Sequence, residues 1–185
     1  MRKVIFAINC TADGFYGHEN MLPDESVHNF FTKLLSSAGC ILYGRITFQL
    51  MIPYWPEIAK NQNEDASSNE FAKTFDSVHK ILFSRSLQKI NESNSVLAQN
   101  NLVDEVLSLK KQPGKDIYIG SLSLASQLTE QELIDEYYFV VHPVIAGQGP
   151  KLFNQTSMQN NLLLDLIGSE KFPSGAIALH YKKRI

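Results

Sequence analysis

Arginines, hydroxyls and glycines follow three short apolar runs of the chain, and together they are suited to binding phosphate. They are Gly44, Arg45 and Thr47 after the first run, Ser84 and Arg85 after the second, and Gly120 and Ser121 after the third. Arginine forms bidentate, charge-assisted hydrogen bonds. Glycine allows close backbone approach, and a helix start adds partial positive charge. These residue types favour a ligand with more than one phosphate.

Each motif alone has an ordinary structural explanation. Arg45 could be a solvated side chain beside a helix-capping Thr47, and Ser121 or Ser123 could simply cap a helix. The combination is informative because all three motifs follow strands, and the carboxyl ends of parallel strands meet at one edge of a sheet. The sequence has neither G-x-G-x-x-G nor G-x-x-x-x-G-K-[ST], which excludes the Rossmann fingerprint and the P-loop.

Three carboxylates are candidate proton donors. Asp13 lies in the TADGFYG loop, and Asp24 and Glu25 precede an apolar helical pattern. A structural alternative stays open for each one: Asp-Gly is a common turn, and carboxylates in a first helical turn interact favourably with the helix dipole. The five histidines have no catalytic spacing with a serine or cysteine nucleophile, and G-x-S-x-G is absent, which disfavours a serine hydrolase.

Composition limits the class of protein. The chain has 185 residues, 44% of them hydrophobic, and a net charge of −2, which predicts one globular domain over residues 1–185 and no nucleic-acid partner. No apolar run is long enough to span a membrane. The N-terminal apolar run reads as a first strand rather than a signal peptide, so a cytoplasmic protein is expected. Cys10 and Cys40 are expected to be buried free thiols, and no metal site is expected.

The apolar patterns alternate between strand and helix. Strands are predicted at 3–10, 40–44, 79–84, 116–120 and 135–147, with a final pair at 162–172 and 176–185. Helices are predicted over 25–38, from Thr47 to a stop at Pro53, from about Glu70, over 100–112 and over 122–133, and the polar stretch 60–69 as a mobile loop. Pro143 inside a strand indicates a sheet edge or a bulge. This order predicts an α/β fold with a mostly parallel sheet and antiparallel C-terminal strands.

A series of motifs carries a family resemblance. TADG, YGRITF, YWP, FSRSL, QPGKDIYIGS, LIDEYYFVVHPVIAGQGPKLF and FPSGAIALHY occur in this order and cover nearly the whole chain. The chain thereby resembles the dihydrofolate reductase-like family, in the branch of the C-terminal reductase domain of the bifunctional riboflavin-biosynthesis protein (RibD). That domain is a 5-amino-6-(5-phosphoribosylamino)uracil reductase.

The resemblance implies a three-layer α/β/α fold, NADPH as hydride donor, a small heterocyclic or carbonyl substrate, and a homodimer. It places the cofactor phosphates at Gly44, Arg45 and Thr47 and the adenosine 2′-phosphate at Ser84 and Arg85. It places the pyrophosphate and ribose at Gly120, Ser121 and Leu122, and the nicotinamide beside Asn9, Tyr16 and Gly17. The strand EYYFVVHPVI and the C-terminal strand are candidate dimer surfaces.

Two departures leave alternatives open. Many relatives have Gly-Gly where this chain has Gly120-Ser121, and any cis peptide bond is expected at that position. The proton donor is also not fixed by the pattern. One alternative is therefore an NADP-binding protein with little catalysis. Another is a genuine dihydrofolate reductase, which the Leu22-Pro23-Asp24 run echoes but the TADG and YWP segments disfavour.

Overall fold

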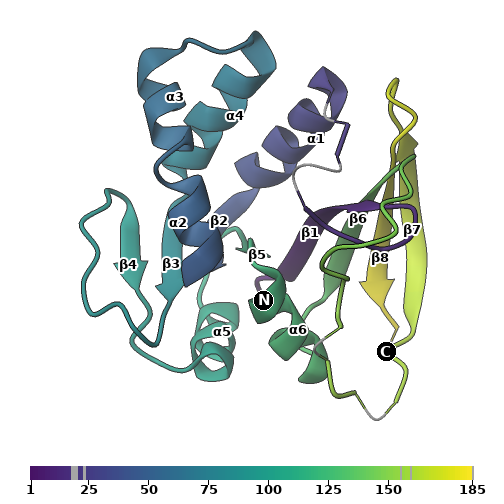
Figure 1. The fold of residues 1–185 in the computed structure, drawn as a ribbon. Helices are drawn as coiled ribbons and strands as arrows, with labels where there is room; N and C mark the ends of the chain where they lie inside the picture. The colour runs from purple at the N-terminus through teal and green to yellow at the C-terminus, as the bar shows by residue number, and fades with distance from the viewer. Residues whose placement is uncertain (18–20, 23, 155, 159, 185) are drawn as a thin grey trace.

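One mixed sheet organises the chain (Figure 1). The computed structural model describes residues 1–17, 21–22, 24–154, 156–158 and 160–184, so Pro23 lies outside the described residues. Within them the strand order is β4-β3-β2-β5-β1-β6-β8-β7. The strands are β1 (Val4–Thr11), β2 (Ala38–Gly44), β3 (His79–Phe83), β4 (Ser95–Leu97), β5 (Asp116–Ile119), β6 (Glu136–His142), β7 (Leu164–Lys171) and β8 (Ile177–Lys183).

The sheet is parallel from β4 to β6 and antiparallel at its C-terminal end. β1 pairs in parallel with β5 and β6, whereas β8 pairs antiparallel with both β6 and β7. Parallel pairing needs crossover connections, which contain helices after β1, β2, β4 and β5, whereas β3 and β4 are joined by a segment without a helix. The predicted mostly parallel sheet with antiparallel C-terminal strands is confirmed, including the pairing of the last two strands.

Helices cover both faces of the sheet, because alternate residues of each buried strand point to opposite sides. Val4, Phe6 and Leu42 pack with α5 (Leu102–Lys111) and α6 (Leu122–Glu130). Ile5 and Ile41 pack on the other face, with α1 (Glu25–Ser36), α2 (Arg45–Met51) and α4 (Ala66–Ser77). Figure 1 shows α1, α3 and α4 above the strands and α5 and α6 below them. The three-layer α/β/α architecture is confirmed.

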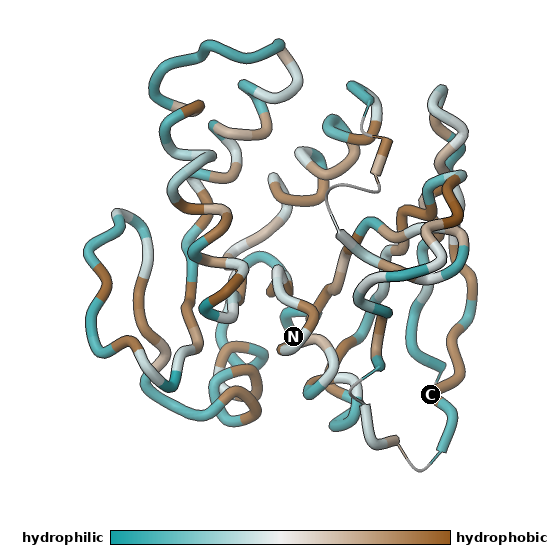
Figure 2. Tube along the Cα trace, viewed as in Figure 1, coloured by the Kyte–Doolittle hydropathy of each residue, from teal (hydrophilic) through white to brown (hydrophobic). Residues whose placement is uncertain are grey.

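The segment between β2 and β3 contains more helix than predicted. Pro53 ends α2 as expected, but the chain then forms α3 (Trp55–Asn61), with Pro56 in its first turn. The predicted mobile loop at 60–69 is wrong: α4 begins at Ala66, because the Asp65 carboxylate accepts the N–H groups of Ser67 and Ser68 at 2.9 and 3.0 Å. The hydrophilic connection between α3 and α4 is short (Figure 2).

Two strand predictions also need correction. β6 ends at His142, so Pro143 lies beyond the strand and marks neither an edge nor a bulge in it. β6 is an interior strand, where a proline would remove a ladder hydrogen bond. β4, only three residues long, was not predicted because so short a strand has little sequence pattern. Cys10 and Cys40 are buried free thiols, as expected.

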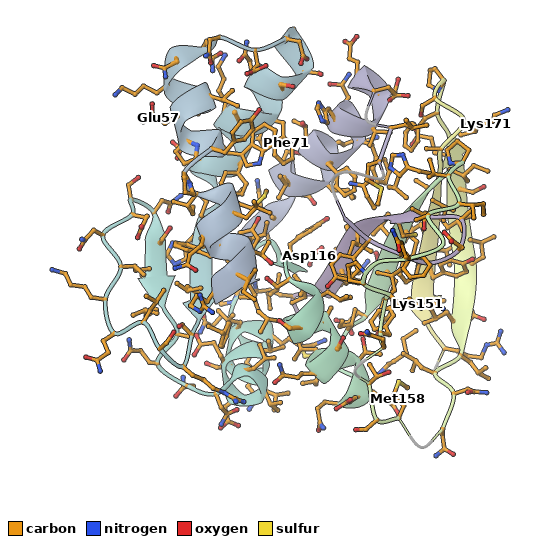
Figure 3. All side chains as sticks on the ribbon, viewed as in Figure 1. Glu57, Phe71, Asp116, Lys151, Met158 and Lys171 are labelled. Atoms are coloured by element: carbon orange, nitrogen blue, oxygen red, sulfur yellow. The ribbon has the colours of Figure 1, made fainter. Side chains whose placement is uncertain are left out.

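Aromatic stacking joins α3, α4 and α1. Phe71 of α4, labelled in Figure 3, packs against Trp55 of α3 with ring centroids 4.5 Å apart. It also stacks with His28 of α1 at 6.4 Å. This packing makes Trp55 a reporter for the α2–α4 segment that follows Gly44. None of the helices in the described ranges is long and apolar enough to cross a membrane.

The cap of α5 gives a direct stability prediction. The Asn101 side chain accepts the backbone N–H of Asp104 at 3.1 Å. We expect Asn101→Ala to lower the free energy of unfolding by about 1 kcal/mol, since it leaves a helix-start donor without its partner. The control is Asn100→Ala, because the Asn100 amide reaches only the exposed Glu105 carboxylate. Equal urea midpoints for the two variants would contradict this assignment.

Candidate phosphate and nicotinamide site

The topology predicts a crevice at the carboxyl ends of β2 and β5. The chain leaves β2 towards the face covered by α2 and α4, but it leaves the adjacent β5 towards the face covered by α6. Loops that diverge in this way leave a crevice between two neighbouring strands. β1 extends it: β1 pairs with β5 only over Val4–Phe6, whereas it pairs with β6 over Ile5–Thr11. In the described chain, the β5-facing edge of β1 beyond Phe6 therefore has no strand partner.

A serine hydroxyl joins the two sides of this crevice. The Gly44 N–H donates to Ser121 Oγ at 2.8 Å, and the Gly120 N–H donates to the Leu42 carbonyl at 2.9 Å. Ser121 is only 3% exposed and occupies the N-cap position of α6. Its Oγ is thus used across the crevice and does not cap its own helix. The ends of β2 and β5 are held together by this contact.

Two helices start at the crevice without side-chain caps, α2 because its N-cap residue is Gly44 and α6 because the Ser121 hydroxyl bonds Gly44. α1, α4 and α5 are capped by Asp24, Asp65 and Asn101. α2 and α6 have no side-chain cap and no acidic residue in their first turn, a combination found in no other helix of the described chain. Helix-start N–H groups carry partial positive charge and bind anions when no cap occupies them. Both helix starts therefore add partial positive charge to the crevice.

Gly120 is required by close packing. A Cβ atom at this position would lie 2.2 Å from the nearest atom of the Tyr43 ring, which is almost completely buried. The described chain has no cis peptide bond, so the prediction of one at Gly120–Ser121 is wrong. A cis bond before serine would cost about 3 kcal/mol. The trans bond lets Gly120 pair with Leu42 while Ser121 reaches Gly44.

The two arginines follow neighbouring strands. Gly44 and Phe83 are direct partners in the β2–β3 pairing, so Arg45 and the Ser84–Arg85 pair begin side by side. Both arginines are exposed, and Arg45 Nη1 donates to Gln49 Oε1 at 2.8 Å. Thr47 is half-buried in the first turn of α2. Ser84 Oγ accepts the Leu87 N–H at 3.0 Å, which shapes the turn that carries Arg85.

A cavity of about 220 Å³ lies beside these arginines, between α2 and the segment that follows β3. It is lined by Phe48, Gln49, Ile52, Pro53, Leu87, Lys89, Ile90, Asn91 and Glu92. Five of these nine residues are apolar, and the other four are polar or charged.

The loop after β1 is held by the segment after β6. Asp13 accepts hydrogen bonds from the Thr11 hydroxyl at 2.6 Å and from the Gly147 N–H at 2.8 Å. The Thr11 bond, followed by the backbone bonds, lowers the pKa of Asp13 to about 2. The Tyr16 N–H donates to the Pro150 carbonyl at 2.9 Å, which holds the half-buried Tyr16–Gly17 segment in place. Asp13 is thus an ionised loop anchor.

Asp24 is also committed to structure. Its two oxygens accept the N–H groups of Val27 at 2.7 Å and Ser174 at 2.9 Å, which ties the start of α1 to the β7–β8 turn. Burial raises its pKa, but the bonds from Ser174 and Val27 outweigh burial, and the pKa of Asp24 is lowered. Glu25 is exposed on the first turn of α1. Asp13 and Asp24 therefore lack the raised pKa that a neutral-pH proton donor needs.

Asn9 meets a residue that the sequence analysis missed. Asn9 Oδ1 lies 2.9 Å from His142 Nε2, and the Leu22 N–H donates to His142 Nδ1 at 3.3 Å. His142 is fully buried, while Asn9 is half-buried. The omission has a simple cause. The apolar pattern predicts a strand that continues to residue 147, whereas β6 ends at His142, so the sequence does not mark His142 as a strand-end residue.

Most of the predicted cofactor residues thus lie in a row at the carboxyl ends of four neighbouring strands. Ser84 and Arg85 follow β3, Gly44 ends β2 and Arg45 follows it, Gly120 to Leu122 follow β5, and Asn9 is near the end of β1. Neighbouring strands are about 4.8 Å apart, so this row extends over roughly 14 Å. Leu122, half-buried, begins α6 and packs against the core. An elongated anionic ligand with a ring at one end would match the order of these groups.

Comparison with known proteins identifies relatives along the full chain. The family model described as the RibD C-terminal domain matches residues 2–178. The uncharacterized protein YyaP of Bacillus subtilis (strain 168) is 34% identical over 188 residues, which cover 97% of this chain and 94% of YyaP.

Solved structures share the fold at low identity. A putative riboflavin biosynthesis protein from Shewanella sp. PV-4 has a TM-score of 0.74 and 18% identity, and the match covers 99% of both chains. A pyrimidine reductase-like protein from Corynebacterium diphtheriae has a TM-score of 0.68 and 16% identity, over 100% of this chain and 92% of that one. A Thermotoga maritima deaminase/reductase matches 99% of this chain at a TM-score of 0.69 and 13% identity, but only 57% of its own length.

The contact between Gly120 and Tyr43 gives a testable prediction. We expect Gly120→Ala to lower the free energy of unfolding by about 1–3 kcal/mol, because the added methyl overpacks a buried ring. Gly168→Ala is the control, since its Cβ would be 3.9 Å from the nearest atom and cost less than about 0.5 kcal/mol. Adding Tyr43→Leu should recover part of the loss in a double-mutant cycle. Equal urea midpoints for Gly120→Ala and Gly168→Ala would contradict the packing argument.

Proposed function

The chain belongs to the RibD C-terminal domain family, and on that premise we propose that it is an NADPH-dependent reductase of a small heterocyclic or carbonyl substrate. The observation that carries the proposal is the pair of uncapped helix starts, α2 and α6, at one crevice. Two adjacent helix starts with Arg45 beside them suit a pyrophosphate.

The residues present fit NADPH in their order along the sheet. Arg85 and Ser84 would hold the adenosine 2′-phosphate, because two neighbouring arginines favour a phosphate over the ribose hydroxyl of NADH. The cavity between α2 and the segment after β3 would take the adenine ring. The part of the crevice beside the unpaired edge of β1 would take the nicotinamide, next to Asn9. When bound, the cofactor supplies a hydride, while the protein supplies position and electrostatics.

The printed descriptions of two relatives support a proposal for the substrate class. The Thermotoga structure is titled a 5-amino-6-(5-phosphoribosylamino)uracil reductase, and the Corynebacterium structure is pyrimidine reductase-like. A pyrimidine with a carbonyl or imine-like carbon is therefore the substrate we propose. Since Asp13 and Asp24 are held ionised by hydrogen bonds, we propose that water in the crevice delivers the proton.

Two alternatives predict different results. An NADP-binding protein with little catalysis would bind NADPH but oxidise it with no pyrimidine, folate or carbonyl compound. A genuine dihydrofolate reductase would bind methotrexate tightly and reduce dihydrofolate. The proposal predicts that NADPH is oxidised with the ribosylaminouracil phosphate and that methotrexate binds weakly.

Titration with NADPH and NADH tests the arginine roles. We expect Arg85→Gln to weaken NADPH binding roughly 10- to 100-fold and to leave NADH binding unchanged, because only NADPH carries the 2′-phosphate. Arg45→Gln should weaken both cofactors, since both contain the pyrophosphate. Binding can be followed by calorimetry and by quenching of Trp55, the only tryptophan.

Arg184→Gln is the matched control, since Arg184 is exposed and bonds Asp165 of β7, far from the crevice. It should bind both cofactors like the wild type. Failure of the wild-type chain to bind either cofactor would reject the proposed function, and equal effects of Arg85→Gln on NADPH and NADH would reject the 2′-phosphate assignment.

We also propose that two copies of the chain pair through β7. The strands considered earlier, β6 and β8, are interior to the sheet, and β7 is the edge strand at this end. Around β7, four apolar residues are 40–56% exposed: Leu163, Leu166, Ile167 and Ile177. A long edge strand with exposed apolar side chains can pair with a second copy, because it leaves unpaired backbone groups and buries apolar surface.

Sedimentation at micromolar concentration tests this pairing. We expect a dimer for the wild-type chain and a monomer for Leu166→Lys with Ile167→Lys, since lysines on an edge strand oppose strand addition. Leu107→Lys, on the surface of α5, is the control and should remain dimeric. A wild-type monomer would reject the proposed pairing.

A further inference from the structure

The hydrogen bonds of His142 determine which of its two ring nitrogens carries the proton. A backbone N–H can only donate, so the Leu22 N–H requires His142 Nδ1 to be an acceptor, without a proton. Full burial lowers the pKa of His142, although the negative charge of Asp24 opposes this, so the ring is neutral at neutral pH. A neutral ring without a proton on Nδ1 carries it on Nε2.

The protonated Nε2 then determines the orientation of the Asn9 amide. An N–H at Nε2 needs an acceptor, and at 2.9 Å it meets Asn9 Oδ1. The amide NH₂ of Asn9 must therefore point away from His142. No acceptor for Asn9 Nδ2 is found among the described residues, and every buried side-chain nitrogen or oxygen there has a partner. Asn9 is half-buried and lies on a strand whose adjacent edge is unpaired beyond Phe6.

We propose that His142 is a positioning residue, which fixes Asn9 as a hydrogen-bond donor that recognises a carbonyl oxygen on the ring bound beside β1. The oxygen belongs either to the nicotinamide carboxamide or to the pyrimidine substrate. The identity of the ring rests on the proposed function, but the orientation of Asn9 does not. His142 also holds Leu22, so one ring joins the segment before α1 to the donor at the site.

The free protein tests the orientation without any ligand. Two-bond ¹H–¹⁵N correlation of the imidazoles should show His142 protonated on Nε2, with its signal assigned by its loss in His142→Gln. Protonation on Nδ1 would overturn the proposal, since Nε2 would then accept from the Asn9 NH₂. This measurement remains decisive even if the wild-type chain binds no NADPH, a result that would reject the proposed function alone.

Variants test the consequence for binding. Asn9→Asp keeps an acceptor for His142 but replaces the donor, and we expect NADPH affinity or the KM for the uracil substrate to worsen roughly three- to tenfold. His142→Leu should cause a similar loss, because Asn9 is then free to turn. His142→Gln, which retains one donor and one acceptor, should restore wild-type values. A merely structural role for His142 would not link the Gln rescue to the Asn9→Asp defect.

The two sources of the oxygen give different results. Weaker binary binding of NADPH to Asn9→Asp assigns it to the nicotinamide carboxamide. Unchanged NADPH binding with a raised substrate KM assigns it to the pyrimidine. Unchanged values of both, in a variant with the wild-type urea midpoint, would overturn the proposal, as would a His142→Gln variant that behaves like His142→Leu.

Discussion

The hydrogen bond from the Gly44 N–H to Ser121 Oγ is the contact on which the site depends. It joins the ends of β2 and β5, from which the chain leaves towards opposite faces of the sheet. Because the Ser121 hydroxyl accepts this hydrogen bond, it does not cap α6, and α6 starts without a side-chain cap, as α2 does. The same geometry places Gly120 directly against Tyr43, where no side chain fits. The close approach of the ends of β2 and β5 thus accounts for the missing cap of α6 and for the need for glycine at position 120.

The charges of the site are local and do not follow from the composition. The chain carries a net charge of −2, yet the crevice has two uncapped helix starts and two arginines. The nearby carboxylates are used differently. Asp13 and Asp24 accept backbone N–H groups, and these bonds help to keep both carboxylates ionised. Asp13 anchors the loop after β1, and Asp24 anchors the start of α1. Anchors of this kind stabilise the walls of a crevice, but they do not release protons at neutral pH.

Sequence reasoning succeeded where a pattern is local and failed where a boundary matters. The glycine, arginine and serine positions at the strand ends were found because each follows a clear apolar run. His142 was missed because the apolar pattern of residues 135–147 continues past the true end of β6. The start of α4 was placed too late, since its first turn is polar and its cap, Asp65, looks like part of a loop. Both errors concern ends of elements, where apolar periodicity carries little information.

The sequence by itself determined the alternation of strands and helices, the residue types that follow the strands and the family, because these depend on local order along the chain. Only the tertiary structure decided which groups are used up and which are left for a ligand. Ser121 could cap α6 or bond Gly44, and Asn9 could present either end of its amide. Those choices are made by partners 77 and 133 residues away in the sequence. No local pattern contains them, because the hydrogen bonds form only when distant strands are brought together.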